Sequence, residues 1–254
     1  MIWIFFWIYA FSMQGLENEE IKGTPDNGVL FFQSFDGKAH YDGWKKTSLS
    51  NYSGIWKIQT PPAPRTDIFE KMLVQTSQDL YSGISTILPN PISYENKPFI
   101  LQFEVRGFKN ITCSSAYIKL FADPHFNQDT FSNETKQFLM FGPDVCHKKR
   151  IVQFAFYHEN PTTHTKIEKS LIDPPIAFKD DLNHLYTLII RPDGTYSILI
   201  DNKSVKKGKF IDSFNPSIIP PKQIPDPSAH KPKDWDSRKF IEDNSYQRKG
   251  SKSE

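Results

Sequence analysis

Short apolar runs, separated by Gly, Pro, Asp and Ser, dominate the chain from residue 28 to about residue 211. In "FILQFEV" (99–105) and "IVQFAF" (151–156) apolar and polar positions alternate, which is the period of a half-buried strand. The runs predict strands at 28–35, 54–59, 71–76, 82–87, 98–108, 115–122, 137–141 and 150–158. Residues 185–205 predict a hairpin, because Pro-Asp-Gly-Thr at 192–195 suits a tight turn.

The chain shows no long apolar pattern with a period of 3.6 residues. Many short strands, with 12 glycines and 19 prolines between and beside them, predict an all-β fold, an antiparallel jelly-roll sandwich over residues 16–214. Prolines accumulate afterwards, so residues 215–241 are expected to form the start of an extended proline-rich arm. The polar residues 242–254 are expected to be a disordered tail.

An unbroken apolar run extends from Ile2 to Phe11. A membrane-spanning helix needs about 20 apolar residues, so the run predicts a secretory signal peptide over residues 1–15 instead. No later stretch is apolar enough to span a bilayer.

Two other features favour the secretory pathway. Cys113 and Cys146 lie 33 positions apart, and a bond between them in an oxidising compartment would contribute roughly 3–4 kcal/mol. Acceptor sequons for N-glycosylation begin at Asn51, Asn110, Asn133 and Asn202.

Composition indicates a globular protein without a nucleic-acid partner. Apolar residues make up 38% of the chain and the formal net charge is only +2, whereas phosphate binding usually shows a concentrated basic face. The short basic run "CHKKR" (146–150) is interpreted as a solvated turn.

The usual catalytic signatures GxSxG, HExxH, GxxxxGK[ST] and GxGxxG are absent. No predicted strand carries the paired carboxylates of a sandwich-fold glycosidase, so the chain is not expected to be an enzyme, and a carbohydrate hydrolase is the weakest reading. His184, at the start of a predicted strand, is interpreted as a structural histidine.

Tyr117 and Lys119 lie two residues apart and therefore on the same strand face, and Met140 lies near Asp144. Two readings stay open. The set provides the ring surfaces, cations and carboxylates that bind a sugar, or Tyr117 belongs to the core and Lys119 is an exposed edge residue.

Four segments resemble the calreticulin/calnexin family of endoplasmic-reticulum lectin chaperones: "KPFILQFEVRGFKNITCSSAYIKLF", "MFGPDVC", "HLYTLIIRPDGTYSILID" and "IPDPSAHKPKDWD". They occur in the family's order, and the resemblance covers residues 28–241. "FYHENP" (156–161) favours the calnexin and calmegin branch, whereas "QTSQD" (75–79) favours calreticulin.

The resemblance implies a lectin domain in the lumen of the endoplasmic reticulum that binds monoglucosylated high-mannose N-glycans on glycoprotein folding intermediates. It implies a disulfide between Cys113 and Cys146 beside the sugar site. Gln137 stands where the family has a second sugar-binding tyrosine, and Ser114-Ser115 replaces a Gly-Gly pair. The sugar-contacting positions that the resemblance implies are Tyr117, Lys119, Gln137, Met140, Asp144 and Glu168.

The resemblance also implies a calcium site, Ca²⁺ being expected near Ser34 and Glu70, with its closing carboxylate supplied by sequence beyond the arm. "IPDPSAHKPKDWD" matches one copy of a tandem repeat whose long hairpin recruits a thiol-disulfide oxidoreductase in the family, and a single repeat is not expected to reach that partner. These departures leave an alternative: a glycan-independent holdase for unfolded proteins, or a degenerate truncated paralogue.

Overall fold

The computed structural model divides the chain into two units, Met1–Ile219 and Pro220–Glu254. For residues 2–10 it describes the backbone alone. The other residues that it describes are 29–35, 43–61, 71–78, 80–88, 90–92, 96–106, 110, 112–161, 163–220, 226, 228–231, 233–236 and 238–240.

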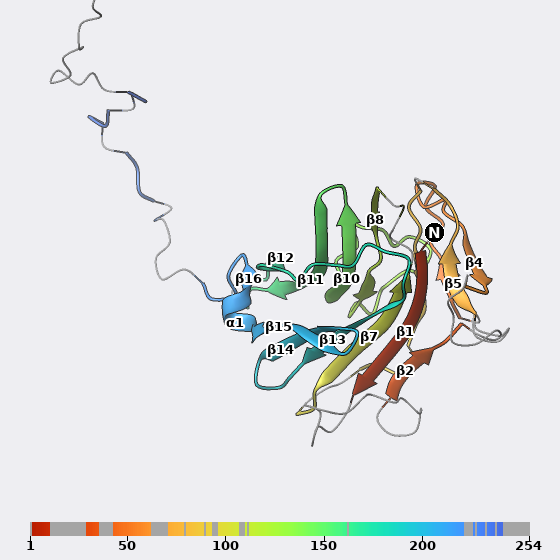
Figure 1. The fold of residues 1–254 in the computed structure, drawn as a ribbon. Coiled ribbons are helices and arrows are strands. Elements are labelled where there is room, and N and C mark those ends of the chain that lie inside the picture. The colour runs from red at the N-terminus through yellow and green to blue at the C-terminus, as the bar shows by residue number, and fades with distance from the viewer. Residues whose placement is uncertain are drawn as a thin grey trace, which may run out of the picture. The chain divides into compact units, whose positions relative to one another are not determined.

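An eight-stranded antiparallel sheet forms one layer of the first unit (Figure 1). Its order is β15-β14-β13-β7-β1-β5-β4, and β2 also pairs with β1. The strands are β1 (Ile2–Ala10), β2 (Val29–Gln33), β4 (Trp56–Gln59), β5 (Met72–Gln75), β7 (Phe99–Arg106), β13 (His184–Ile190), β14 (Thr195–Ile200) and β15 (Lys203–Lys209).

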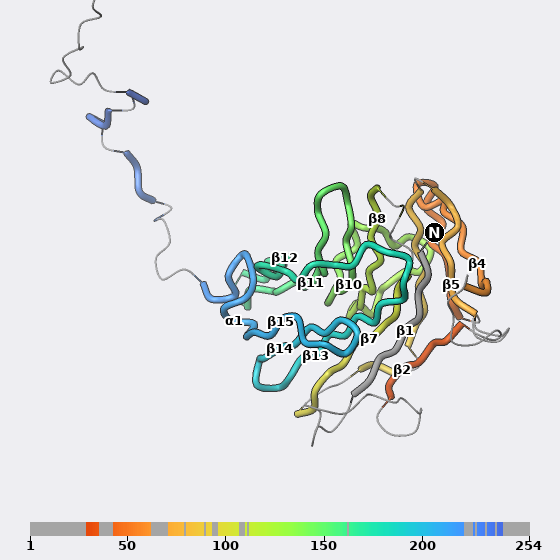
Figure 2. The backbone as a smooth tube through the Cα atoms, viewed as in Figure 1, coloured from red at the N-terminus to blue at the C-terminus, as the bar shows by residue number. Residues whose placement is uncertain are grey.

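A six-stranded sheet forms the second layer in the order β16-β12-β11-β10-β8, with β9 also paired to β10. Its strands are β8 (Cys113–Ser115), β9 (Ile118–Leu120), β10 (Leu139–Cys146), β11 (Lys149–Glu159), β12 (Lys166–Leu171) and β16 (Phe214–Asn215). Two short strands, β3 (Lys45–Lys46) and β6 (Ile84–Ser85), pair separately, and α1 spans Phe210–Ser213. Residues 172–183 connect β12 of one sheet with β13 of the other (Figure 2).

The core lies between the two sheets, where alternate residues of facing strands meet. Phe103 of β7 packs edge-on against Phe141 of β10, with ring centroids 6.0 Å apart. Phe154 of β11 packs edge-on against Tyr196 of β14 at 5.6 Å. All four rings are fully buried, so the alternation that predicted strands also sets which side chains form the core.

The predicted β-sandwich is confirmed, although the structure contains strands that the pattern did not show. β12 was missed because "KIEKSL" carries charged residues on three of its positions, so its apolar and polar residues show no clear alternation. β10 continues through Gly142 and Pro143 as far as Cys146. Pro143 has no N–H to donate, and the pair that it forms with Val152 uses none, because Val152 donates its own N–H to the carbonyl of Pro175. On the other side, the Pro143 carbonyl accepts a hydrogen bond from the N–H of Ala116.

The first apolar run forms β1, which lies between β7 on one side and β2 and β5 on the other. Eight residues of β1, Trp3 to Ala10, face residues of β7 in register. The prediction of a signal peptide over residues 1–15 stays a prediction, and the backbone pairing shows that the same run joins the two parts of the large sheet in this chain.

Removing residues 1–14 is expected to expose one edge of β7. Amide hydrogens of residues 99–106 that point toward β1 should then exchange at least about tenfold faster, because their strand partner is gone. Hydrogen exchange measured by mass spectrometry on the full chain and on a chain beginning at Gly15 tests this. Strand β14, which lies between β13 and β15, is the internal control; equal protection of β7 in both chains would show that β1 does not support the sheet.

His184 is confirmed as a structural histidine at the start of β13. The ring is buried and stacks on Phe178 with centroids 4.0 Å apart. Its Nδ1 lies 2.8 Å from the Asp201 carboxylate and its Nε2 lies 2.9 Å from the Asp180 carboxylate. The imidazole therefore links the β14–β15 turn, through Asp201, to the loop before β13, through Asp180.

Replacing His184 with Ala should lower the free energy of unfolding by about 2–4 kcal/mol, because two carboxylates lose their partner and a cavity forms beside Phe178. Urea denaturation followed by fluorescence measures the change. His125→Ala removes an exposed imidazole and should change the unfolding energy by no more than about 0.5 kcal/mol. Equal effects of the two substitutions would contradict the structural role of His184.

The second unit contains local contacts around Trp235, which is 57% exposed. The Lys231 ammonium lies 5.8 Å from the centroid of the indole ring, and the Arg238 guanidinium donates to both carboxylate oxygens of Asp236. Residues 242–254, the predicted disordered tail, lie outside the described residues. Among the described residues, no helix has the length and apolarity required to cross a membrane.

Candidate functional site

Four of the predicted sugar-contacting residues gather on the outer face of the six-stranded sheet. Lys119 of β9 is the register partner of Met140 of β10, and Ser115 of β8 is the register partner of Asp144. Tyr117 lies between β8 and β9, two residues from Lys119. The structure therefore brings Tyr117, Lys119, Met140 and Asp144 together on adjacent strands.

The alternation of β10 decides which of its residues face outward. Leu139, Phe141 and Val145 belong to the buried core cluster, so Met140 and Asp144 point to the opposite face. Gly142 lies between them with a φ of 149°, and a Cβ atom there would lie 2.1 Å from the carbonyl oxygen of Ala116. A glycine is required because the backbone of residue 116 approaches this position closely.

Burial shifts the pKa values of two titratable groups of the site, Tyr117 and Lys119. Desolvation raises the pKa of the Tyr117 phenol well above its usual value, and Asp144 raises it further, while a hydrogen bond with Ser115 lowers it. Desolvation lowers the pKa of the Lys119 ammonium, whereas the carboxylates of Glu168 and Glu134 raise it. Tyr117 therefore stays a neutral hydrogen-bonding group. The negative charge of Glu168 favours the charged form of Lys119.

The structure pairs Gln137 with Glu168, two positions that are 31 residues apart in sequence. The buried Gln137 side chain donates from Nε2 to a carboxylate oxygen of Glu168 at 3.0 Å. The buried Gln137 amide thus holds one oxygen of the Glu168 carboxylate, and the sugar-contacting role of Gln137 stays a prediction. Met140, by comparison, is only 9% exposed, although it lies on the outer face of its strand.

Sequence reasoning missed Tyr157, an aromatic residue on the same face. It is the register partner of Glu168, and the Lys136 ammonium lies 6.0 Å from the centroid of its ring. Desolvation, followed by the charges of Glu168 and Glu134, raises the pKa of its phenol. The alternation of "FAFYHE", in which Phe154 and Phe156 face the core, is the signal that places Tyr157 on the outer face.

Ser115 and Lys149 were missed as well, and both contact Asp144. The Ser115 hydroxyl donates to Asp144 Oδ1 at 3.0 Å, and the Lys149 ammonium donates to Oδ2 at 2.7 Å. Lys149 follows the turn at residues 147–148, as expected for "CHKKR", but its ammonium binds a carboxylate and is not only solvated. No feature of the basic run itself identifies this contact.

A disulfide joins Cys113 of β8 to Cys146 at the end of β10, as the resemblance implies. The two residues are register partners, and His147 donates its N–H to the carbonyl of Thr112 beyond them. The bond therefore holds β8 against β10 next to Ser115 and Asp144.

Tyr117, Lys119 and Asp144 line a cleft of about 2450 Å³. Its other lining residues include Trp44, Tyr81 and Ile87. The cleft is large enough for several sugar rings or for an extended peptide.

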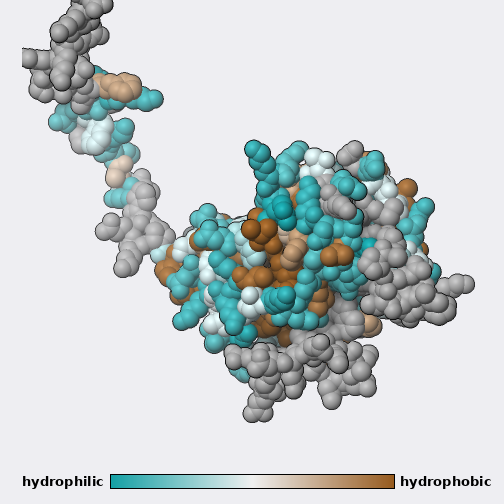
Figure 3. Space-filling model, viewed as in Figure 1, coloured by the Kyte–Doolittle hydropathy of each residue, from teal (hydrophilic) through white to brown (hydrophobic). Residues whose placement is uncertain are grey.

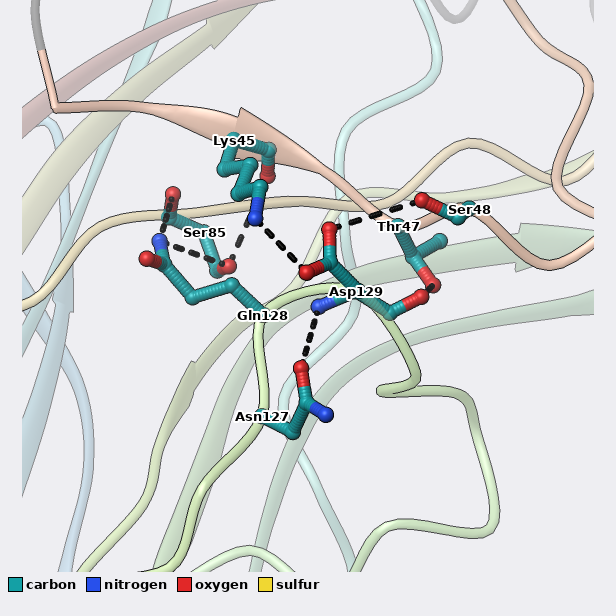
Figure 4. A network of polar contacts seen from close by, with 7 residues as sticks. All are labelled: Lys45, Thr47, Ser48, Ser85, Asn127, Gln128 and Asp129. Atoms are coloured by element: carbon teal, nitrogen blue, oxygen red, sulfur yellow. Dashed lines mark hydrogen bonds and ion pairs between the residues drawn. The ribbon is translucent and has the colours of Figure 1, made fainter.

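A polar network fixes the loop after β9 that forms part of the cleft lining (Figure 4). Asp129 of this loop accepts hydrogen bonds from Lys45 at 2.7 Å and from Ser48 at 3.4 Å. Gln128 donates to the carbonyl oxygen of Ser85 at 2.9 Å. Segments more than 40 residues apart in sequence are thereby held together beside the cleft.

The predicted calcium site near Ser34 and Glu70 stays a prediction. Ser34 follows β2, and Glu70 lies outside the described residues. Among the described residues, the one cluster of three or more His, Cys, Asp or Glu ligand atoms consists of Cys113, Cys146 and His147. It does not fit Ca²⁺, which binds oxygen ligands, because both cysteines are in the disulfide.

The four predicted glycosylation sites all lie on the surface. The side chains of Asn51, Asn110, Asn133 and Asn202 are exposed, so each is accessible for modification. Occupancy of these sequons stays a prediction.

Comparisons with known proteins agree with this arrangement. Residues 31–253 match the profile of the Calreticulin family. Calmegin of Bos taurus is 37% identical over 235 residues, which cover 87% of this chain and 38% of calmegin. A calnexin homolog of Aspergillus fumigatus is 37% identical over 185 residues, which cover 72% of this chain and 33% of the homolog. The chain belongs to the calreticulin family.

The globular domain of T. cruzi calreticulin has a similar structure. The TM-score is 0.66 at 28% sequence identity, and the match covers 84% of this chain and 75% of that domain. The predicted family is thus confirmed, and the fold is that of a family of lectin chaperones. The chain spans only 33% to 38% of the length of the two relatives.

Gly142→Ala is expected to destabilise the protein by about 3 kcal/mol, because the added methyl group meets a backbone carbonyl and the φ angle disfavours alanine. Gly194→Ala is the matched control: its φ of 75° is also positive, but nothing lies within 4 Å of the added atom. Urea denaturation of both variants separates the backbone strain from the steric clash. Equal destabilisation would show that the backbone of Ala116 does not restrict residue 142.

Proposed function

We propose that this protein is a lectin-type chaperone that binds monoglucosylated high-mannose N-glycans on folding glycoproteins. The observation that carries the proposal is the assembly of Tyr117, Lys119, Met140 and Asp144 on one face, beside a cleft. A tyrosine ring and a thioether cover the C–H face of a sugar. Lysine donates hydrogen bonds to sugar hydroxyls, and the carboxylates of Asp144 and Glu168 accept them.

The endoplasmic-reticulum lumen is the proposed location. The disulfide between Cys113 and Cys146 requires an oxidising compartment, and the four exposed sequons fit a secretory protein. Proposed partners are glycoprotein folding intermediates, which carry the glycan. Calcium, which the family resemblance implies near Ser34 and Glu70, stays a prediction.

Lys119→Ala should weaken binding of a monoglucosylated oligosaccharide by about tenfold or more, because a partly buried charged donor is lost. Isothermal titration calorimetry measures the dissociation constant. Lys207→Ala, which removes an exposed lysine of β15, is the control and should bind as tightly as the wild type. A wild-type protein that does not bind the oligosaccharide would refute the proposed lectin function.

A glycan-independent holdase is the second candidate, because the protein exposes large apolar side chains. Figure 3 shows apolar residues gathered in the middle of one face of the first unit, among hydrophilic ones. Tyr81 and Ile87 in the cleft lining are 68% and 69% exposed. Suppressed aggregation of a denatured, non-glycosylated client by both the wild type and the Lys119→Ala variant would support this function, and its loss in the variant would reject it.

A further inference from the structure

Both carboxylate oxygens of Asp144 are bound by side chains of neighbouring strands. The Ser115 hydroxyl of β8 reaches Oδ1, and the Lys149 ammonium of β11 reaches Oδ2. The carboxylate itself is 9% exposed, whereas 53% of the Lys149 side chain is exposed. A carboxylate of this kind is stable in a buried position because it is paired on both sides.

Ser115 also lies next to the phenol of Tyr117. Beside the larger effect of desolvation, Ser115 lowers the pKa of this phenol, and the negative charge of Asp144 raises it. Ser115, Asp144 and Lys149 thus form one chain of hydrogen bonds across β8, β10 and β11, and Tyr117 lies beside it. The group combines two predicted sugar-contacting residues, Tyr117 and Asp144, with two residues that sequence reasoning did not place in the site, Ser115 and Lys149.

We propose that Ser115 and Lys149 are positioning residues of the sugar site, which orient the Asp144 carboxylate and the Tyr117 phenol toward the ligand. This inference rests on the proposed lectin function. Neither residue needs to touch the sugar; each acts by holding a group that does.

The geometry favours positioning over competition with the ligand. Each carboxylate oxygen has about two lone-pair sites, and each of the two hydrogen bonds uses one, so both oxygens keep a site for a sugar hydroxyl. A neutral sugar cannot compensate a buried charge, and therefore the protein itself must supply the cation that accompanies Asp144. Lys149 is the cation that reaches it.

The disulfide fixes this arrangement. Cys146 is the register partner of both Cys113 on one side and Lys149 on the other. Asp144 lies two residues before Cys146, and Ser115 lies two residues after Cys113. The three strands that carry the serine, the aspartate and the lysine are therefore joined at one end.

Calorimetry with a monoglucosylated oligosaccharide tests the proposal on the full chain. Ser115→Ala and Lys149→Met should each weaken binding by about tenfold or more, the effect of one lost hydrogen bond to a charged group. The conservative variants Ser115→Thr and Lys149→Arg should restore binding, because each keeps the donor. The neighbouring substitutions Ser114→Ala and Lys148→Met, which leave the Asp144 contacts in place, should change binding by less than about twofold.

A measurement of unfolding in urea accompanies each titration, so that a loss of folded protein is not mistaken for a loss of affinity. Wild-type binding with equal or tighter binding by Ser115→Ala and Lys149→Met would overturn the positioning role while the lectin function stands. Failure of the wild type to bind would refute the lectin function and, with it, this inference. Weaker binding that Thr and Arg do not restore would show a general structural role and also overturn the proposal.

Discussion

The contact between the two sheets, through Phe103, Phe141, Phe154 and Tyr196, is the interaction on which the rest of the structure depends. Edge-to-face aromatic pairs contribute roughly 0.5–1.5 kcal/mol beyond the burial of their surface. Their larger effect here is geometric. Because strand residues alternate between faces, the burial of Phe141 places Met140 on the outer face. The packing of the core thereby determines which residues of β10 reach the candidate site.

The charged groups of the candidate site are arranged in pairs before any ligand arrives. Asp144 is held by Lys149, and Glu168 is bound by Gln137 and lies near Lys119. This arrangement suits a neutral ligand with many hydroxyl groups, since such a ligand supplies no charge to balance a buried carboxylate or ammonium. A ligand that carried charge would instead be expected to meet unpaired groups of the opposite sign.

The cleft beside this site depends on contacts that are distant in sequence. Asp129 and Gln128 hold the loop after β9 against β3 and β6, and the disulfide holds β8 against β10. The site therefore lies on strands, whose positions are set by the core, while its surroundings depend on polar contacts between loops. Substitutions in these loops would change access to the site more than its internal geometry.

The sequence by itself determined the all-β architecture, the main strands at 99–106 and 184–200, and the family, because alternation and motif order are local properties of the chain. Only the tertiary structure decided the pairing of Gln137 with Glu168, the binding of Asp144 by Ser115 and Lys149, and the extension of β10 through Pro143. The hydrophobic pattern did not predict the strand at 166–171 either. Its charged residues hide the alternation, and it forms a strand because its backbone pairs with β11. Polar partners are chosen by the register between strands and by the space between their side chains, and neither is encoded in the spacing of residues along one segment.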